Sequence, residues 1–496
     1  MKSVIGRLPS HQFRAVLLGC ALFGHGTALA QTQPQRLFVV LSVDQMRFDF
    51  LERFGHLYKG GLARLLEEGA VYTDAYQDHF YTSTAAGHAT ISTGVFPSRS
   101  GIVANSWWDR KARRRVYAVA DPKSPIVDRP DLAGRSPANM QRNALGDWLK
   151  RESRESKVFS VSLKDRSAIT MGGERPDGVY WYDSDAGRFI TSEYYLDAVP
   201  EWVREFNDAK LADGYFEKEW TRLLPEEAYS ASREDSFPFE SDGVDVTFPH
   251  RFDIPADSEA EEIPESMRPR YPSLYYDELK RTPFVDELTF AFIERMIVSE
   301  QLGADDVPDL LFVGASAADY IGHRYGPLSQ ETQDYYLRLD QRLDEFLNFL
   351  DATVGEGRFA LVLTSDHGVL PIPEELARQG IDAKRIDRLV RQGIVVPPLT
   401  DVLSEFGLTE KLAGVLVSPY GVTMRFETRC RNGTRDRYGA PWPRGCVIPI
   451  LWRTRLRMTT SAIKRTIRSG SYTCGVFIPI VRPISSYGIK RTICTA

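Results

Sequence analysis

The chain contains four nearly continuous apolar runs, and each ends in charged residues. They are 37–44 (LFVVLSVD), 157–166 (KVFSVSLKDR), 309–319 (DLLFVGASAAD) and 358–368 (RFALVLTSDHG). Such runs are typical of parallel strands that are covered on both faces of a sheet. The pattern therefore predicts four buried parallel strands. The charged residues at their ends are Asp44, Lys164, Asp165, Arg166, Asp319, Asp366 and His367.

Helical periodicity lies between these runs. Segment 61–69 (GLARLLEEG) has leucines on one face, and segment 284–303 is expected to end at a capping Gly303. Segment 331–355 places a stripe of Leu339, Leu343, Phe346 and Leu350 on one face. Strands that alternate with helices predict an α/β fold, a doubly wound, mostly parallel sheet sandwiched by helices. In such folds ligands bind beyond the carboxyl ends of the strands, so the charged strand ends should share one rim.

Two segments depart from this alternation. Residues 170–285 are rich in Pro, Glu, Asp and aromatic residues, and 178–195 (GVYWYDSDAGRFITSEYY) has the pattern of a hairpin with its turn at DSDAG. We interpret 170–285 as an insertion beside the rim. A second insertion is expected over about residues 371–425.

The first thirty residues have the pattern of a secretory signal. A basic start is followed by an apolar run, 15–24 (AVLLGCALFG), which is too short to span a bilayer. The small residues Ala28 and Ala30 then form a cleavage pattern, so we expect cleavage near Ala30 and a periplasmic or secreted protein. Lipoprotein processing at Cys20 is the alternative.

Composition indicates a soluble globular protein, with 43% hydrophobic and 26% charged residues. The net charge of −5 gives no overall indication of nucleic-acid binding, and no later segment has the pattern of a membrane span. Residues 31–429 contain no cysteine. An exported core without cysteine must depend on packing or on bound metal rather than on disulfides.

The end of the chain differs from the rest. No acidic residue follows Asp436, and four of the five cysteines lie within 430–496. Three interpretations of 431–496 are open: a basic tail for anionic lipid or nucleic acid, a small disulfide-bonded appendage, or a segment translated out of frame. We favour the last, because the segment lacks clear helical or strand periodicity. The catalytic domain is then expected to span 31–430.

The strand ends supply candidate metal ligands, namely Asp44, Asp319, His323, Asp366 and His367. Asp319 and His323 are four residues apart, so one turn of helix or a tight loop aims both at one ion. Mixed oxygen and nitrogen ligands suit zinc, with manganese or iron as alternatives. Two metal ions about 4 Å apart stabilise the entering and leaving oxygens of phosphoryl transfer.

Three hydroxyl residues, Thr82, Ser83 and Thr84, precede a segment of small residues that is expected to begin a helix (AAGHATISTG). A bound metal lowers the pKa of a hydroxyl and makes it a nucleophile. A helix N-terminus favours phosphate oxygens, although a hydroxyl there also serves as a cap. Spacing alone does not choose among the three. We interpret the neighbouring His88 as a structural hydrogen-bonding residue.

Three further side chains suit a phosphate group. The Arg166 guanidinium matches two phosphate oxygens, and Lys164 adds a point charge. Their spacing predicts that both project from the same side of a strand end. The Asn105 side chain, in GIVANSWWDR (101–110), is a donor for a further oxygen.

Five segments together resemble the alkaline phosphatase superfamily. They are VDQMRFDF (43–50), TSTAAGHATISTGVFPSRSGIVANSWWDR (82–110), SLKDRSAITMGG (162–173), ADYIGHRYGP (318–327) and TSDHGVLP (364–371). They are most similar to bacterial alkaline phosphatases of the phosphate-irrepressible type, which use a threonine nucleophile and are related to nucleotide pyrophosphatases/phosphodiesterases. The resemblance extends over about residues 36–425.

The resemblance implies a role for each matched residue. Thr84 would be the phosphorylated nucleophile. Asp44, Thr84, Asp366 and His367 would face one zinc ion, and Asp319 and His323 would face the other. Asn105, Lys164 and Arg166 would hold the phosphoryl oxygens, and the Lys–x–Arg pair is typical of the monoesterase branch.

The resemblance fails at one ligand. Family members supply a further zinc histidine near the C-terminus, whereas no histidine follows His367 in this chain. We expect an enzyme that hydrolyses small phosphate monoesters through a phosphothreonine. The alternatives are a phosphodiesterase or nucleotide pyrophosphatase at the same site, and an inactive homologue that binds metal or phosphate.

Overall fold

The computed structural model describes residues 34–383, except 110, 216–217, 241–244 and 252–270, and the side chains of 271–274 are also outside the description. It further describes the backbone of three strands, β9 (Leu412–Ser418), β10 (Gly421–Phe426) and β11 (Pro449–Ile450). The expected signal segment and most of the basic tail therefore lie outside the described residues.

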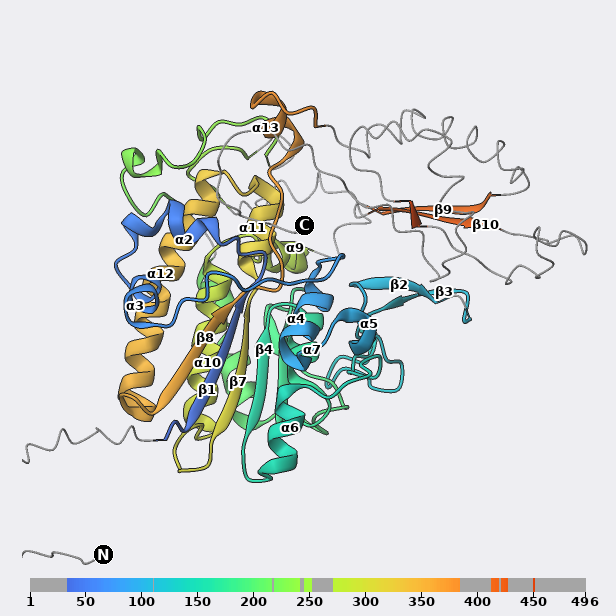
Figure 1. Cartoon of the computed structure of the whole chain (residues 1–496). Helices are drawn as coiled ribbons and strands as arrows, with labels where there is room; N and C mark the ends of the chain where they lie inside the picture. Colours follow the sequence, from blue (N-terminus) through green and yellow to red (C-terminus); the bar gives the residue numbers. More distant parts are fainter. Residues whose placement is uncertain are drawn as a thin grey trace, which may run out of the picture.

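A central sheet of six strands organises the described part, in the order β6-β5-β4-β7-β1-β8 (Figure 1). Its members are β1 (Leu37–Val43), β4 (Val158–Ser162), β5 (Gly178–Asp183), β6 (Arg188–Ile190), β7 (Asp309–Ala315) and β8 (Phe359–Thr364). Neighbouring strands are parallel except for β5 and β6. The four predicted strands are all present and adjacent, which confirms the predicted fold class.

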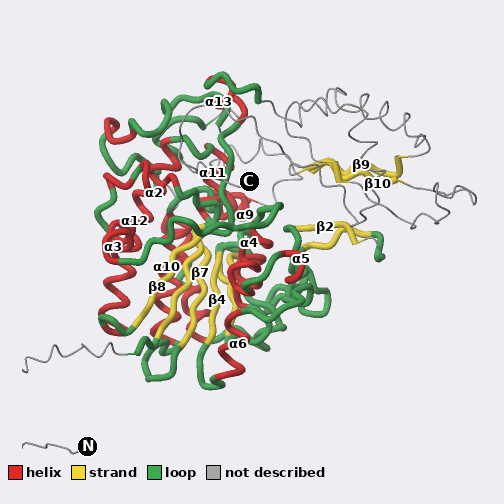
Figure 2. Tube along the Cα trace, viewed as in Figure 1, coloured by secondary structure: helices red, strands yellow, loops and turns green. Residues whose placement is uncertain are grey.

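Helices cover both faces of the sheet (Figure 2). On one face lie α10 (Phe284–Ser299) and α12 (Gln330–Leu350); on the other lie α4 (Thr84–Thr93), α6 (Leu145–Glu152) and α7 (Asp165–Gly172). Alternate residues of β1, such as Val39 and Leu41, share one buried cluster with Phe292 of α10 and Leu343 of α12. Val40 instead packs in a cluster that includes Met171 of α7. The strand is apolar throughout because both of its faces are covered.

The remaining elements lie at the periphery of this sandwich. They are α2 (Asp49–Arg53), η1 (Gly55–Leu57), α3 (Gly61–Glu68), α5 (Pro97–Ser100), β2 (Ser106–Asp109), β3 (Arg114–Tyr117), α8 (Glu201–Asp208), η2 (Leu211–Tyr215), η3 (Glu226–Tyr229), α9 (Tyr271–Leu279), α11 (Ala317–Tyr325), η6 (Asp351–Gly355) and α13 (Pro373–Arg378). The predicted helix at 61–69 is confirmed as α3, with Gly69 as its C-cap.

Two predicted strands end earlier than expected. The run 309–319 leaves the sheet at Ala315, and Asp319 lies instead in the first turn of α11. Likewise β4 ends at Ser162, so that Lys164 is the N-cap of α7 and Arg166 lies in its first turn. The prediction that Lys164 and Arg166 project from a strand is therefore wrong, because helix geometry begins immediately after the strand.

The helix predicted over 284–303 also ends early. Helix α10 stops at Ser299, and Gly303 lies beyond the helix C-cap with φ +71°. The Gly303 N–H is bound by the Asp309 carboxylate at 2.9 Å, which fixes the turn that leads into β7. The stripe predicted over 331–355 is confirmed, since Leu339, Leu343, Phe346 and Leu350 are all buried.

The predicted hairpin at 178–195 forms the outer edge of the central sheet. Strands β5 and β6 pair antiparallel, with Trp181 opposite Ile190. The Asp183 carbonyl accepts the N–H of Gly187 at 2.8 Å and closes the turn. Strand β5 also pairs with β4, so this part of 170–285 belongs to the main sheet. The limits of the two insertions remain predictions.

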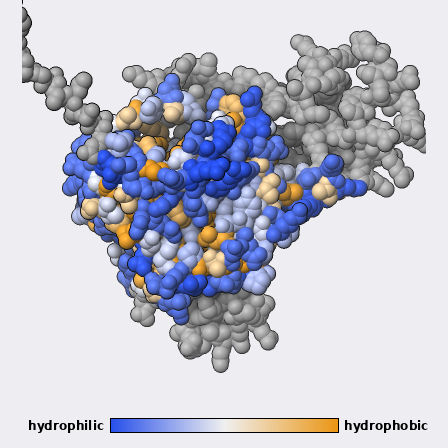
Figure 3. Space-filling view, turned by 90° about the horizontal axis from the view of Figure 1, so that it is seen from below, coloured by the Kyte–Doolittle hydropathy of each residue, from blue (hydrophilic) through white to orange (hydrophobic). Residues whose placement is uncertain are grey.

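The face seen from below, at the amino ends of the strands, is mainly hydrophilic with scattered apolar areas (Figure 3). Among the described residues, no helix combines the length and the apolar character that crossing a membrane requires.

Candidate active site

The predicted site residues converge at the carboxyl end of the sheet, where α4 and α11 begin close to the ends of β1, β7 and β8 (Figure 1). Strands β1 and β7 end in register, with Val43 opposite Ala315. Asp44 follows β1 directly, and Asp366 and His367 follow β8 within three residues. The sheet therefore delivers side chains that are far apart in sequence to one point.

Asp44, Asp319 and His367 form the centre of this site. One ligand atom from each lies within 4.8 Å of the others, a geometry that can hold a metal ion. Asp44 is 0% exposed and Asp319 is 5% exposed. Burial, and then the nearby Asp366 carboxylate, raise the pKa of Asp44 to about 6, although Lys164 opposes the shift. Charges at such a density require a compensating cation.

His367 directs one ring nitrogen at the carboxylates. Its Nδ1 lies 2.9 Å from the Gly368 carbonyl, so Nδ1 must carry a proton to bond there. Its Nε2 lies 3.4 Å from Oδ1 of Asp44 and 3.4 Å from Oδ2 of Asp366. The Asp366, Asp44 and Asp319 carboxylates raise the pKa of His367 against the effect of burial. In the neutral ring, the Nε2 lone pair points at the same place as the carboxylates, which is the arrangement of a metal ligand.

Asp366 is held by groups on three sides. Its Oδ1 accepts the backbone N–H of Gln45 at 3.1 Å, and its Oδ2 lies 3.3 Å from Nδ1 of His88. Burial alone would raise the pKa of Asp366, but His367 and His88 hold it well below its usual range. The His88 Nδ1 also lies 2.8 Å from the Thr84 carbonyl. The interpretation of His88 as a structural hydrogen-bonding residue agrees with these contacts.

Asp319 and His323 share one face of α11. Their contact between Nε2 of His323 and Oδ1 of Asp319 is 3.2 Å long, as the spacing of four predicted. The same Oδ1 accepts a hydrogen bond from Nε2 of Gln45 at 2.8 Å. His323 keeps a side chain that is 53% exposed, so this half of the site is open to solvent.

Lys164 lies between the two acidic residues. Its ammonium group is 2.6 Å from Oδ2 of Asp44 and also contacts Oδ2 of Asp319. Burial would lower the pKa of Lys164, but Asp319 and Asp44 raise it, so the side chain is a permanent cation. The Tyr320 ring lies 4.9 Å from the same ammonium group.

Thr84 is the hydroxyl residue that faces the cationic groups. It is the first residue of α4 and is 3% exposed. Nη2 of Arg166 lies 3.5 Å from its Oγ1. Ser83 is the N-cap of α4 but makes no side-chain capping hydrogen bond. The structure thus separates Thr84 from the other two hydroxyl residues by its position beside Arg166.

Asn105 and Arg166 are fixed beside Thr84. The Oδ1 of Asn105 accepts the N–H of Ala85 at 2.8 Å, which leaves its amide Nδ2 as a donor. Burial would lower the pKa of Arg166, but Tyr117 and Tyr320 raise it, so it remains charged. The backbone N–H of Arg166 donates to the Asp165 carboxylate, which also accepts from the Tyr117 hydroxyl.

A glycine permits α4 to approach the metal-ligand loop. A Cβ at Gly87 would lie 2.2 Å from the Asp366 carbonyl oxygen. Because that neighbour is backbone, a larger residue would push Thr84 and Asp366 apart. The AAGH segment therefore requires glycine at this position for a packing reason.

The residues at this site fit a metal ion. The Asp44 Oδ1 atom is buried and accepts no hydrogen bond from the residues described, with Nε2 of His367 as an ion-pair contact at 3.4 Å. Oxygen and imidazole donors together suit a divalent transition metal. The ligand atoms that converge are those of Asp44, Asp319 and His367.

Sequence reasoning missed Gln45, Tyr117 and Tyr320. Gln45 is 3% exposed, has φ +68°, and its backbone and side chain bind two different carboxylates. Its position directly after Asp44 was the available signal. Tyr117 and Tyr320 contact cations through the folded arrangement, which no local pattern indicates.

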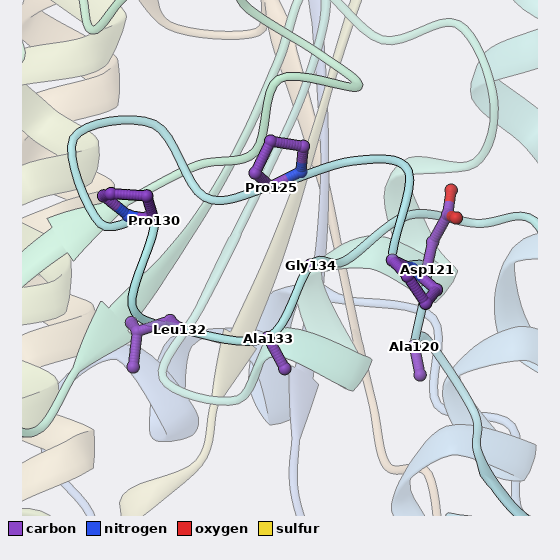
Figure 4. A pocket seen from close by; sticks show the side chains of 8 residues that line it. Ala120, Asp121, Pro125, Pro130, Leu132, Ala133 and Gly134 are labelled. Carbon is purple, nitrogen blue, oxygen red and sulfur yellow. The ribbon is translucent and has the colours of Figure 1, made fainter.

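One pocket is lined by residues outside the candidate site. A cavity of about 290 Å³ is lined by residues of the loop 120–134, including Pro125, Pro130 and Leu132 (Figure 4). It contains none of the predicted site residues. The Asp121 carboxylate at its edge accepts hydrogen bonds from Ser124 and Ser136.

Residues 38–406 match the family model described as type I phosphodiesterase / nucleotide pyrophosphatase. The chain belongs to this family. The match covers the whole site described above and confirms the resemblance to the alkaline phosphatase superfamily that the five motifs indicated.

Two curated relatives carry more specific names. Alkaline phosphatase PhoV of Synechococcus elongatus is 38% identical over 344 residues, which are 68% of this chain and 60% of the relative. Alkaline phosphatase PafA of Elizabethkingia meningoseptica is 36% identical over 367 residues, which are 73% of this chain and 64% of the relative. The chain thus spans less than two thirds of the length of these relatives.

Solved structures of PafA have the same fold. The wild-type enzyme superimposes with a TM-score of 0.68 at 32% identity, over 78% of this chain and 72% of that chain. A PafA variant with one threonine, one asparagine, one lysine and one arginine substituted gives a TM-score of 0.64 at 32% identity, over 70% of this chain and 66% of that chain.

Proposed function

We propose that this protein hydrolyses phosphate monoesters, with Thr84 as the nucleophile and with divalent metal ions, zinc in particular, held by the carboxylates and histidines of the rim. The observation that carries the proposal is the position of Thr84. Its hydroxyl lies at the N-terminus of α4, 3.5 Å from the Arg166 guanidinium, and His88 contacts both the Thr84 carbonyl and the Asp366 carboxylate. The names of PhoV and PafA support the same activity.

The ligand set follows from the side chains. Asp44, Thr84, Asp366 and His367 would face one metal ion, and Asp319 and His323 the other. Bound divalent ions would neutralise the buried carboxylates and make the threonine hydroxyl more acidic. Asp366 holds its charge because His367 and His88 lower its pKa, so it is ready to bind a cation.

The protein side chains would orient the phosphoryl group. The Arg166 guanidinium binds two oxygens in a fork, and the Asn105 amide donates to a third. The Thr84 hydroxyl then loses its proton to solvent and its oxygen attacks phosphorus. The bond from phosphorus to the ester oxygen breaks, and the leaving oxygen takes a proton from water and departs as the alcohol. Water hydrolyses the resulting phosphothreonine and releases inorganic phosphate. The N-terminus of α4 stabilises negative charge on the phosphoryl oxygens.

Lys164 and Arg166 favour a monoester over a diester. A monoester carries one more charged oxygen than a diester. Arg166 lies 3.5 Å from the Thr84 hydroxyl, Lys164 contacts Asp44 and Asp319, and both side chains remain charged. In the PafA variant, the substituted lysine and arginine are also two positions apart, and the other substituted types match Thr84 and Asn105. These matches support the roles proposed for Thr84, Asn105, Lys164 and Arg166 in this chain.

The test compares an aryl phosphate monoester with the matching aryl diester. The wild-type protein should turn over the monoester much faster, and Thr84→Ala should abolish turnover of both. Lys164→Ala should lower monoester kcat/KM by roughly 100-fold or more, the scale of losing one donor to developing charge. A diesterase or nucleotide pyrophosphatase would instead prefer the diester.

The same assays test the inactive alternative. Metal content of the purified protein should be two ions per chain for an enzyme with both sites filled. A protein with one ion or none and no turnover of either ester would contradict the proposal. We further propose that the protein acts outside the cytoplasm, since the signal pattern of residues 1–30 supports export.

A further inference from the structure

A strongly basic hairpin projects beside the candidate site. Strands β2 and β3 pair antiparallel and extend away from the body next to α5 (Figure 1). The turn and β3 carry four exposed cationic residues, Lys111, Arg113, Arg114 and Arg115. The Asp109 carboxylate is occupied by the backbone N–H groups of Lys111 and Ala112, at 2.8 and 2.9 Å. The arm thus concentrates positive charge at its tip.

The chain as a whole has a net charge of −5. Within the described part of the chain, the side chains of Lys111, Arg114 and Arg115 form no salt bridge. A cluster of cations on a chain of negative net charge gives a local potential that the overall net charge conceals. The arm is therefore a candidate binding surface for an anion.

Both strands of the arm are anchored to the phosphate-binding residues. Asn105 precedes β2, binds the N–H of Ala85 in α4, and accepts the N–H of Ala118 at 3.0 Å. Tyr117, the last residue of β3, donates its hydroxyl to Asp165, next to Arg166. The base of the arm is therefore part of the site.

The length of the arm sets the span of the ligand. Four residues of strand extend roughly 14 Å at about 3.4 Å each. Phosphates of one stacked nucleic-acid strand follow one another at about 3.4 Å along the axis. A phosphate at Thr84 would thus be followed by several further phosphates before the strand reached the tip. A small monoester would not reach it.

We propose that the β2–β3 arm binds the anionic chain of substrates whose terminal phosphate monoester enters the site, such as a short single-stranded oligonucleotide with a terminal phosphate. The proposal rests on the proposed function for the identity of the cleaved group. The basic tip recognises the charge of the following phosphates, independent of sequence.

The test measures binding and turnover separately. The double variant Arg114→Ala/Arg115→Ala is compared with Arg151→Ala/Arg154→Ala, which removes two exposed arginines at the end of α6 and in the loop that follows it. Binding of a fluorescent, 5′-phosphorylated single-stranded DNA is followed by anisotropy over a range of salt. The arm variant should reduce the magnitude of the slope of log affinity against log salt concentration by about 1.4. Each of the two phosphate contacts that it loses contributes about 0.7 to that slope.

Turnover separates this proposal from the proposed function. Both double variants should hydrolyse a small aryl phosphate at the wild-type rate, and only the arm variant should have a higher KM for the phosphorylated DNA. Equal DNA affinity and salt slope in the two variants would overturn the arm proposal. So would loss of binding to phosphatidylserine-rich vesicles without loss of DNA binding. Absence of aryl phosphate turnover in the wild type would overturn only the proposed function, because anisotropy needs no catalysis.

Discussion

Lys164 places its ammonium group 2.6 Å from the Asp44 carboxylate, and both side chains are 0% exposed. The same ammonium group contacts Asp319 on another helix. One lysine therefore contacts two buried acids of the candidate metal centre, and its single positive charge offsets one of their two negative charges. The free energy of unfolding is therefore expected to depend on which charged groups are present at the site.

Removal of this lysine should destabilise the metal-free protein. Lys164→Ala leaves two buried carboxylates without their cation, and breaking a buried pair costs about 3–5 kcal/mol. Urea unfolding of chelator-treated protein measures the effect. Lys150→Ala is the control, because Lys150 pairs at 2.7 Å with the half-exposed Asp177 and such pairs contribute about 0–1 kcal/mol. Equal losses in the two variants would show that the buried triad contributes nothing special.

Metal removal should lower the melting temperature of the wild-type protein. An ion present at about 100 times its Kd stabilises the folded state by about 2.7 kcal/mol. Asp44→Asn should remove most of this gain, because Asp44 is one of three residues whose ligand atoms converge within 4.8 Å. Calorimetry with and without zinc measures both. The exposed Asp208 gives the control, and Asp208→Asn should keep the full zinc response.

Gly87→Ala should impair the site without a change in its chemistry. The added methyl would lie 2.2 Å from the Asp366 backbone oxygen, so α4 or the Asp366 loop must move. A displacement of this kind is expected to lower kcat/KM by about 100-fold. Gly55→Ala is the matched control, because a Cβ there would meet nothing within 4 Å. Steady-state kinetics compare the two, and wild-type activity in Gly87→Ala would disprove the close approach.

His250 should make stability depend on pH. Its ring lies 2.9 Å from Glu331 and 3.0 Å from Asp245, and it is buried. Burial lowers the pKa of His250, but hydrogen bonds to Asp245 and Glu331 outweigh it and raise the pKa to about 9. The folded state binds the His250 proton more tightly than the unfolded state does. The contribution of protonated His250 to the free energy of unfolding is therefore complete below about pH 6.5 and is lost as pH rises through about 9.

The measurement is the free energy of unfolding of wild type and His250→Gln between pH 6 and pH 10. The difference should be largest at the acidic end and should shrink by as much as about 1.4 kcal/mol per pH unit. His56→Gln, at an exposed position, is the control variant. A difference that grows with pH would contradict the assignment of the proton to His250.

Much of the fold was predictable because its signals are local. Strand β1 is covered on both faces and is therefore apolar nearly throughout, whereas α12 is covered on one face and shows an apolar stripe. The ends of the helices and strands were predicted less accurately. Asp319 was placed at the end of a strand, whereas it lies in the first turn of α11. The choice between strand and helix in a short apolar run depends on long-range packing rather than on the run itself.

The candidate site was predictable in its types of residue but not in its contacts. The spacing of Asp319 and His323 is local, and the structure brings them to 3.2 Å as expected. The position of Lys164 between Asp44 and Asp319 depends on three separate elements. Gln45 escaped notice because a glutamine carries no chemical signature until it is placed beside carboxylates.

The sequence by itself determined the alternation of strands and helices, the types of residue at the strand ends, and the family motifs, since each depends on residues close together in the chain. Only the tertiary structure decided which hydroxyl faces Arg166, which acids share Lys164, and where the basic arm lies relative to Thr84. These relationships join segments that are far apart in sequence. They depend on strand order and register, which are fixed by the packing of the whole sheet between its helices.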